Sequence, residues 1–149
     1  MSSPLTATAL VARLGVSRET GDRLAAYVAL LATWQKRINL VGPSTLADPW
    51  RRHILDSAQL MPHIAAGSSV ADLGSGAGFP GLVLAILGNF NVHLIESDQR
   101  KAVFLREAAR VTGAAVTVHA RRLETVTDLT ADVITARALA PLDKLLAWA

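Results

Sequence analysis

The chain has 149 residues, of which 51% are hydrophobic, and this is enough for one domain with a substantial core. It contains no Cys, which excludes disulfides and a Cys nucleophile, and its four scattered His residues form no zinc pattern, so we expect no metal. Fifteen Lys and Arg against twelve Asp and Glu give a net charge of +3, a mild bias towards polyanionic partners. Because neither a signal peptide nor a membrane-length apolar stretch is found, we expect a cytoplasmic protein without membrane contact.

Three segments near the start of the chain place apolar residues at helical spacing. Each begins beside a residue that favours a helix start, namely Pro4, Ser17 and Pro49. The predicted helices cover residues 3–14, 18–37 and 50–64. Together they form an N-terminal helical extension over residues 1–66.

After the Gly- and Ser-containing segment 65–69, strand patterns alternate with helical ones. We predict strands near residues 70–73, 92–96, 115–119 and 132–136, with helices near 81–87 and 98–112. This alternation predicts an α/β fold, a doubly wound and mainly parallel Rossmann-like sheet over residues 67–149 that packs with the extension into one globular unit. The expected strand order is third, second, first, fourth, and ligands of such sheets bind beyond the carboxyl ends of the strands.

The first predicted strand runs into a glycine loop, VADLGSGAGFPG, over residues 70–81. Its glycines, Gly74, Gly76, Gly78 and Gly81, allow a tight turn and close approach of a ligand to the backbone. Counted from Gly76, the spacing satisfies the GxGxxG pattern of dinucleotide sites, so the loop alone does not separate NAD(P), FAD and S-adenosylmethionine.

Two acidic residues narrow the choice of ligand. Asp72, two residues ahead of the first glycine, would repel a pyrophosphate but attract the sulfonium and ammonium groups of S-adenosylmethionine. Glu96, about 20 residues beyond Gly76, suits the ribose hydroxyls of either cofactor. The loop and Asp72 therefore favour the methyl donor. The alternative is that both carboxylates merely face solvent at strand ends.

Six phrases of the sequence, in this order, resemble those of the RsmG family, also called glucose-inhibited division protein B: NLVGPST, RRHILDS, ADLGSGAGFPGLVLAI, ESDQRKAVFLRE, ARRLETV and ITARALAPLDKLL. Members of that family are class I methyltransferases that methylate N7 of a guanine in 16S ribosomal RNA. The resemblance implies S-adenosyl-L-methionine as cofactor, 16S ribosomal RNA or the small-subunit particle as partner, and a monomeric full-length protein. The family continues past a helix that begins at Pro141 with strands that complete a seven-stranded sheet. Since this sequence stops at Ala149, we expect those strands to be missing and activity to be slight.

The resemblance also indicates cofactor-binding residues. By this comparison the contacts fall on Gly74, Phe79, Glu96, Ser97, Asp98, Leu123, Glu124 and Arg137. The charge of Asp72 and the glycine spacing of the loop add Asp72, Gly76 and Gly78 to the predicted cofactor-binding residues.

Arg137, at the end of the fourth predicted strand, is the candidate catalytic residue. Its guanidinium can donate to guanine O6 while N7 faces the methyl group. The alternative is an ion pair with Glu124 or Asp132 that holds the loop. His53 and Asp56, spaced i and i+3, are expected to form a structural pair.

Four basic residues of the extension are candidates for RNA phosphate contacts: Lys36, Arg37, Arg51 and Arg52. The alternative for them is a solvated helix face. The absence of Cys argues against methylation at C5 of a pyrimidine, which leaves a ring nitrogen or a ribose hydroxyl as acceptor, and only the resemblance selects guanine N7. Two other functions stay open: a methyltransferase for a small molecule or protein, and a nucleotide-binding module without catalysis.

Overall fold

The computed structural model describes residues 3–137. Within this range the chain forms α1 (Ala7–Leu14), α2 (Arg18–Gln35), η1 (Pro43–Ala47), η2 (Trp50–Leu55), α3 (Asp56–Ala58), η3 (Met61–His63), β1 (Ser69–Leu73), α4 (Gly81–Leu87), β2 (Asn91–Ile95), α5 (Gln99–Thr112), β3 (Val116–His119), η4 (Leu123–Thr125) and β4 (Val133–Ala136). The helix expected from Pro141 and the end of the chain at Ala149 lie outside the described residues.

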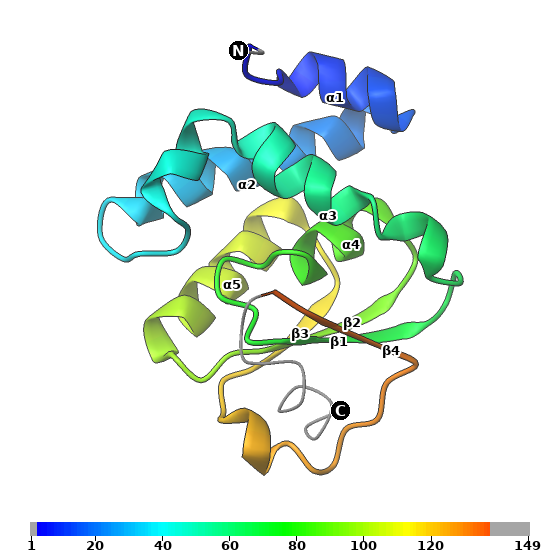
Figure 1. Cartoon of the computed structure of the whole chain (residues 1–149). Coiled ribbons are helices and arrows are strands. Elements are labelled where there is room, and N and C mark those ends of the chain that lie inside the picture. The colour runs from blue at the N-terminus through cyan, green and yellow to red at the C-terminus, as the bar shows by residue number, and fades with distance from the viewer. Residues whose placement is uncertain (1–2, 138–149) are drawn as a thin grey trace.

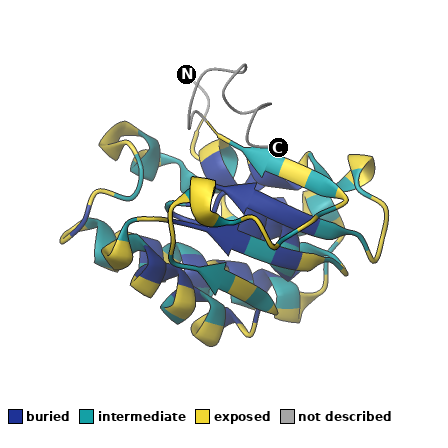
Figure 2. Ribbon diagram, turned by 90° about the horizontal axis from the view of Figure 1, so that it is seen from below, coloured by how far each residue is buried: buried dark blue, intermediate teal, exposed yellow. Residues whose placement is uncertain are grey.

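The four strands form one parallel sheet in the order β3-β2-β1-β4, which confirms the expected order. Val70 of β1 pairs with Val92 of β2 on one side and with Val133 of β4 on the other. The two central strands are mostly buried, whereas β3 and β4 at the edges of the described sheet are partly exposed (Figure 2). The strand order changes direction at β1, so the carboxyl ends of β1 and β4 flank the point where a ligand of such a sheet binds.

The two faces of the sheet are covered differently. Helices α4 and α5 pack on one face, and α2 lies across them as a further layer (Figure 1). The other face carries a small cluster built on Ala71, Leu73 and Ile95, which is covered by Leu123 and Val126 of the segment between β3 and β4. The α/β Rossmann-like fold class is therefore confirmed, although within residues 3–137 no α-helix covers this second face.

Local signals fixed several helix limits as predicted. The Ser17 side chain accepts a hydrogen bond from the Thr20 N–H and caps α2, and Gly113 ends α5 with φ 71°. The expected start of the first helix at residue 3 is wrong, because the Thr6 side chain caps α1 by accepting from the Ala9 N–H.

The third predicted helix, over residues 50–64, is not continuous. It begins with the wide π-helical turns of η2, passes through the single turn of α3, and ends in the 3₁₀ turn η3, which contains Pro62. The wide turns place three successive residues, His53, Ile54 and Leu55, in the interior. Such a run is incompatible with the one-sided stripe of the amphipathic helix that the sequence pattern suggested.

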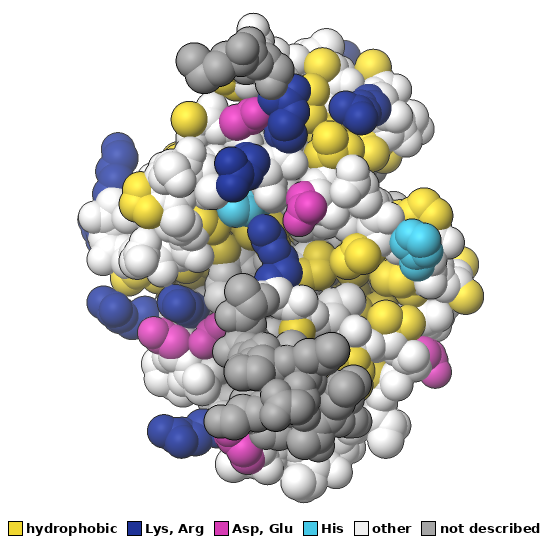
Figure 3. All heavy atoms as spheres, viewed as in Figure 1, with side chains coloured by type: hydrophobic (Ala, Val, Ile, Leu, Met, Phe, Trp, Pro, Cys, Tyr) yellow, Lys and Arg dark blue, Asp and Glu magenta, His cyan; other side chains and the backbone are white. Residues whose placement is uncertain are grey.

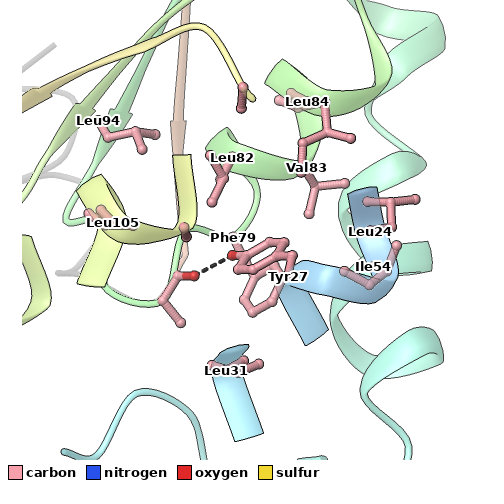
Figure 4. Close-up of a cluster of buried hydrophobic side chains, with 14 of the residues drawn as sticks. Leu24, Tyr27, Leu31, Ile54, Phe79, Leu82, Val83, Leu84, Leu94 and Leu105 are labelled. Atoms are coloured by element: carbon pink, nitrogen blue, oxygen red, sulfur yellow. Dashed lines mark hydrogen bonds between the residues drawn. The ribbon is translucent and has the colours of Figure 1, made fainter. Parts of the chain in front are cut away.

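Tyr27 of α2 links the helical extension to the glycine loop. Its ring is fully buried and stacks on Phe79 at a centroid distance of 5.2 Å, and its hydroxyl donates a hydrogen bond to the Ala77 carbonyl oxygen (Figure 4). Residues of the extension and of the sheet belong to one buried cluster, which contains Leu10 as well as Leu94. The division at residue 66 stays a prediction.

Candidate functional site

The glycine loop follows β1 and is held by one backbone hydrogen bond to β2 and by one within the loop. The Ser75 N–H donates to the Ile95 carbonyl oxygen at 3.0 Å, and the Gly78 N–H donates to that of Ser75 at 2.7 Å. Gly74, Gly76 and Gly78 all have positive φ. At Gly78 a side chain is also excluded by packing, because a Cβ there would lie 2.5 Å from the Tyr27 hydroxyl. The loop is thus a rigid turn whose shape depends on glycine.

Glu96 supports this loop. Its Oε1 accepts from the Gly76 N–H at 2.7 Å and its Oε2 accepts from the Asp98 N–H at 2.9 Å. Asp98 in turn caps α5, and the bonds that it accepts from the Lys101 and Arg100 N–H groups hold its pKa below the ordinary value. The structure therefore gives Glu96 and Asp98 backbone partners, and their contact with a cofactor stays a prediction.

Asp72 is turned into the interior. Its side chain is 1% exposed and lies beneath the first turn of α4. There Oδ1 accepts from the Thr135 hydroxyl at 2.8 Å and Oδ2 accepts from the Gly81 N–H at 3.3 Å. Burial raises its pKa to about 6, against the opposing effect of these hydrogen bonds. The expected cofactor contact of Asp72 stays a prediction, but what the structure shows is a carboxyl that ties β4 and α4 to β1.

Two cavities flank the glycine loop and share Gly74. One, of about 180 Å³, is lined by Gly74, Ile95, Ser97, Arg121, Arg122, Leu123 and Glu124. The other, of about 240 Å³, is lined by Leu40, His53, Gly74, Ser75, Gly76, Ala77, Phe79, Lys101 and Arg137. We call them the η4 cavity and the loop cavity.

Seven of the eleven predicted cofactor residues line these two cavities: Gly74, Gly76, Phe79, Ser97, Leu123, Glu124 and Arg137. The other four, Asp72, Gly78, Glu96 and Asp98, do not line them. The structure thus brings residues from the ends of β1, β2 and β4 and from η4 to one edge of the sheet.

Arg137, which directly follows β4, lies against the buried His53 of η2. Its Nη1 is 3.5 Å from His53 Nδ1, its guanidinium carbon is 5.9 Å from the Phe79 ring centroid, and its Nη2 is 3.7 Å from Asp56 Oδ2. The sequence offered Glu124 or Asp132 as the ion-pair partner, and this is wrong, because the acidic neighbour is Asp56. The carboxylate of Asp132 accepts from the Ser69 N–H instead.

His53 is 5% exposed and stacks on Phe79 at 4.7 Å. Burial and the nearby Arg137 and Arg52 lower its pKa to about 4, so it is neutral at neutral pH. Its Nε2 is 2.7 Å from Thr45 Oγ1, which itself donates to the Gly42 carbonyl oxygen. Since Arg137 can only donate, His53 accepts at Nδ1 and carries its proton on Nε2.

The expected pairing of His53 with Asp56 is therefore wrong. The ring nitrogens of His53 face Thr45 and Arg137 instead. The wide turns of η2 cause the difference, because they turn His53 inward while leaving Asp56 exposed.

The four candidate RNA-binding residues differ in their surroundings. Lys36, Arg37 and Arg52 are exposed. Arg51 is half-buried and donates to Asp48 Oδ2 at 2.5 Å and to the Ser3 carbonyl oxygen at 3.1 Å, so it ties down the N-terminal segment. Figure 3 shows basic side chains spread over the face of the molecule seen in Figure 1, with histidine and acidic side chains among them.

The sequence profile of the GidB family, described as rRNA small subunit methyltransferase G, matches residues 21–149. The chain belongs to the GidB family. It is 62% identical over 141 residues to ribosomal RNA small subunit methyltransferase G of Paramagnetospirillum magneticum, covering 94% of this chain and 69% of that one. With the protein of the same name from Rhodospirillum centenum the identity is 64% over 141 residues, covering 94% and 65%. The resemblance to the RsmG family and the class of enzyme that it implied are confirmed.

Solved structures agree on the fold. A variant of MtNAS in complex with S-adenosylmethionine matches this GidB family chain with a TM-score of 0.57 at 16% identity, over 91% of this chain and 59% of that one. Ribosomal protein L11 methylase of Lactobacillus delbrueckii gives 0.53 at 23% identity, over 64% and 50%. In the described part of this chain, no helix is both long and apolar enough to cross a membrane, and no three acidic or histidine side chains gather as metal ligands.

Some site residues of this GidB family chain were not predicted. Lys101 and Leu40 line the loop cavity. The sequence places Arg121 and Arg122 near the predicted cofactor face but as merely exposed arginines, and both line the η4 cavity. The position of Lys101, three residues after the helix-capping Asp98, is a signal that could have placed it near the loop. Leu40 belongs to the phrase NLVGPST, which resembles the family, but its spacing does not place it beside the glycine loop, because the packing of the extension brings it there.

Proposed function

We propose that this chain binds S-adenosyl-L-methionine across the η4 cavity and the loop cavity and transfers its methyl group to N7 of a guanine in 16S ribosomal RNA. The observation that carries the proposal is that two cavities at the carboxyl ends of β2, β1 and β4 are both lined by Gly74. An elongated ligand with a flat base at one end and a charged group at the other suits two neighbouring cavities of this kind.

The residues of the η4 cavity suit an adenosine. Ile95 and Leu123 offer apolar surface for a flat ring, and Leu123 packs on the cluster that contains Ile95. Ser97 and Glu124 supply polar groups at the same wall. Ile95 is positioned by β2 and Leu123 by the 3₁₀ turn η4, so the proposed adenine subsite is formed before the cofactor binds.

The loop cavity suits the amino-acid end of the cofactor. Lys101 offers an ammonium for a carboxylate, and the glycine loop offers close backbone approach at Gly76. Asp72 would support the site indirectly. Its hydrogen bonds with the Gly81 N–H and the Thr135 hydroxyl hold the start of α4 and the end of β4 beside the cavities.

When bound, S-adenosyl-L-methionine supplies an electrophilic methyl group on a sulfonium. Guanine N7 has a lone pair and no proton, so no side chain of the chain needs to act as a general base. The task of the protein is then positioning. The Arg137 guanidinium would donate to guanine O6, with neutral His53 accepting one of its N–H groups and keeping it aimed.

The exposed basic residues Lys36, Arg37 and Arg52 would hold RNA phosphates near this edge of the sheet. Arg51 is held by Asp48 and contributes to the N-terminal structure instead. The substrate is thereby proposed to be a polyanion, in accord with the net charge of +3.

Calorimetry followed by a transfer assay tests the proposal. The chain should bind S-adenosylhomocysteine and S-adenosylmethionine, and it should not bind NADH. Labelled S-adenosylmethionine with unmethylated 16S ribosomal RNA or small subunits should then yield 7-methylguanosine on nucleoside analysis. Binding of NADH in place of the methyl donor would support the nucleotide-binding module, and label in any other nucleoside would refute N7 as the acceptor.

A further inference from the structure

A third cavity adjoins the loop cavity at Arg137. It measures about 440 Å³ and lies between the segment that follows η2 and the carboxyl end of β4. Arg137 lines both cavities, so the third one opens beside the place proposed above for the methyl donor. Its volume is in the range of small-ligand sites. We call it the Asp56 cavity.

Two of its polar groups, the Asp56 carboxylate and the Ser57 hydroxyl, accept or donate no hydrogen bond within the described part of the chain. The Asp56 side chain is 56% exposed, and its nearest charged neighbour is the Arg137 guanidinium at 3.7 Å, beyond hydrogen-bond distance. Ser57 is 1% exposed, and its hydroxyl has no hydrogen-bond partner in the described part of the chain. A buried hydroxyl without a partner costs free energy unless a ligand or water supplies one.

Apolar side chains form the walls. Leu60 is partly buried, and Ile134 of β4 is 41% exposed. The exposed amide of Gln59 completes the rim. A cavity with apolar walls and a few unpaired polar groups suits a flat, polar-edged ring.

The order of charges matches one base. Along the edge of guanine the N7 and O6 acceptors are followed by the N1–H and N2–H donors. A guanidinium at O6 and a carboxylate at N1–H and N2–H must then stand side by side, as Arg137 and Asp56 do. Adenine has a donor where guanine has O6 and an acceptor at N1, so the same pair of side chains would meet it with the wrong groups.

We propose that the Asp56 cavity binds the acceptor base as an unpaired guanine, whose N1–H and N2–H groups donate to the Asp56 carboxylate while Arg137 donates to O6. The inference rests on the proposed function and adds the residue that selects the base. Because Asp56 takes the edge that a base pair would use, the target guanine has to be unpaired to enter.

Nuclear magnetic resonance titrations test this with the chain first saturated with S-adenosylhomocysteine. GMP should shift the backbone signals of Asp56, Ser57 and Gln59, and IMP, which lacks only the N2 amino group, should bind about tenfold more weakly, as expected for loss of a hydrogen bond to a charged group. AMP should not shift these signals. All three nucleotides carry the same phosphate, so the differences report on the base.

The variant Asp56→Asn should remove the preference for GMP over IMP while leaving S-adenosylhomocysteine binding unchanged. Asp22→Asn, the same substitution at an exposed position on α2, is the matched control and should retain the preference. Equal binding of GMP and IMP to the unaltered chain, no shift with GMP, or a preference that survives in Asp56→Asn would each overturn the inference. Failure to bind S-adenosylhomocysteine would instead count against the proposed function.

Discussion

Two glycines of the loop, Gly78 and Gly76, differ in what surrounds them. At Gly78 a Cβ would lie 2.5 Å from the Tyr27 hydroxyl, so the protein itself excludes a side chain. At Gly76, with φ +54°, a Cβ would meet only the Gly74 carbonyl oxygen at 3.8 Å. The space above Gly76 therefore belongs to the loop cavity, and a side chain there would occupy the volume proposed for the cofactor.

Gly76→Ala should therefore weaken S-adenosylhomocysteine binding by tenfold or more in calorimetry. Gly113→Ala is the matched control, because Gly113 also has positive φ, +71°, and open space around it, but it ends α5 away from the cavities. Both variants should lose about 1 kcal/mol of unfolding free energy from backbone strain. If Gly76→Ala bound as tightly as Gly113→Ala, the loop would not be the cofactor site.

At the scale of elements, the wide turns of η2 give two neighbouring arginines different tasks. Arg51 is held by Asp48 and the Ser3 carbonyl oxygen, whereas Arg52 is exposed and no hydrogen bond or ion pair within residues 3–137 engages its side chain. Arg51 and Arg52 had the same predicted role, but in the structure Arg51 stabilises the N-terminal segment and only Arg52 stays a candidate for a phosphate contact.

Arg52→Ala should lower the affinity for 16S ribosomal RNA and flatten the slope of log K against log salt by roughly 0.7 to 0.9, the value for one phosphate contact. Arg51→Ala should instead lower the thermal unfolding midpoint and change the slope little. Filter binding at several salt concentrations, beside thermal unfolding, distinguishes the two. A slope that is unchanged in Arg52→Ala would assign Arg52 to the solvated surface.

The elements that the sequence predicts well are those limited by local chemistry. The helix over residues 81–87, the cap at Ser17 and the stop at Gly113 follow from side chains and glycines at the helix ends themselves. The strand order was predicted from the doubly wound sheet that alternating strands and helices favour, which is a rule of chain connection rather than a local signal. The helix limits, by contrast, each depend on a few residues close together in the sequence.

Prediction failed where packing between distant segments decides. Residues 50–64 carry a helical pattern, but the core draws His53 inward and the helix widens into π turns. The sequence pattern likewise does not show that the Thr135 hydroxyl and the Gly81 N–H hold the Asp72 side chain inside, and the contact of Asp72 with a cofactor stays a prediction. Both outcomes involve partners 9 to 84 residues away, which no local pattern contains. The motif gave the place of the site, and tertiary contacts decided which side chains face it.

At the scale of the whole molecule, Asp72 and His53 are two buried titratable groups, both influenced by Arg137, whose effects on stability depend on pH in opposite directions. The pKa of Asp72 is about 6 in the folded protein, above its ordinary 3.8, so its contribution to stability is complete below pH 3.8 and is lost as pH rises through 6. The pKa of His53 is about 4, below its ordinary 6.5, so its contribution is complete above pH 6.5 and is lost as pH falls towards 4.

Each shift of about two units corresponds to about 3 kcal/mol of unfolding free energy, so between pH 4 and 6.5 the two effects nearly cancel. Asp72→Asn should leave the His53 effect alone, and stability should then rise with pH. His53→Gln should leave the Asp72 effect alone, and stability should fall with pH over the same range. Urea unfolding of the three proteins at pH 4, 5, 6 and 7 measures the slopes. Variants whose slopes share one sign would show that the two groups are not buried as opposed titrating sites around Arg137.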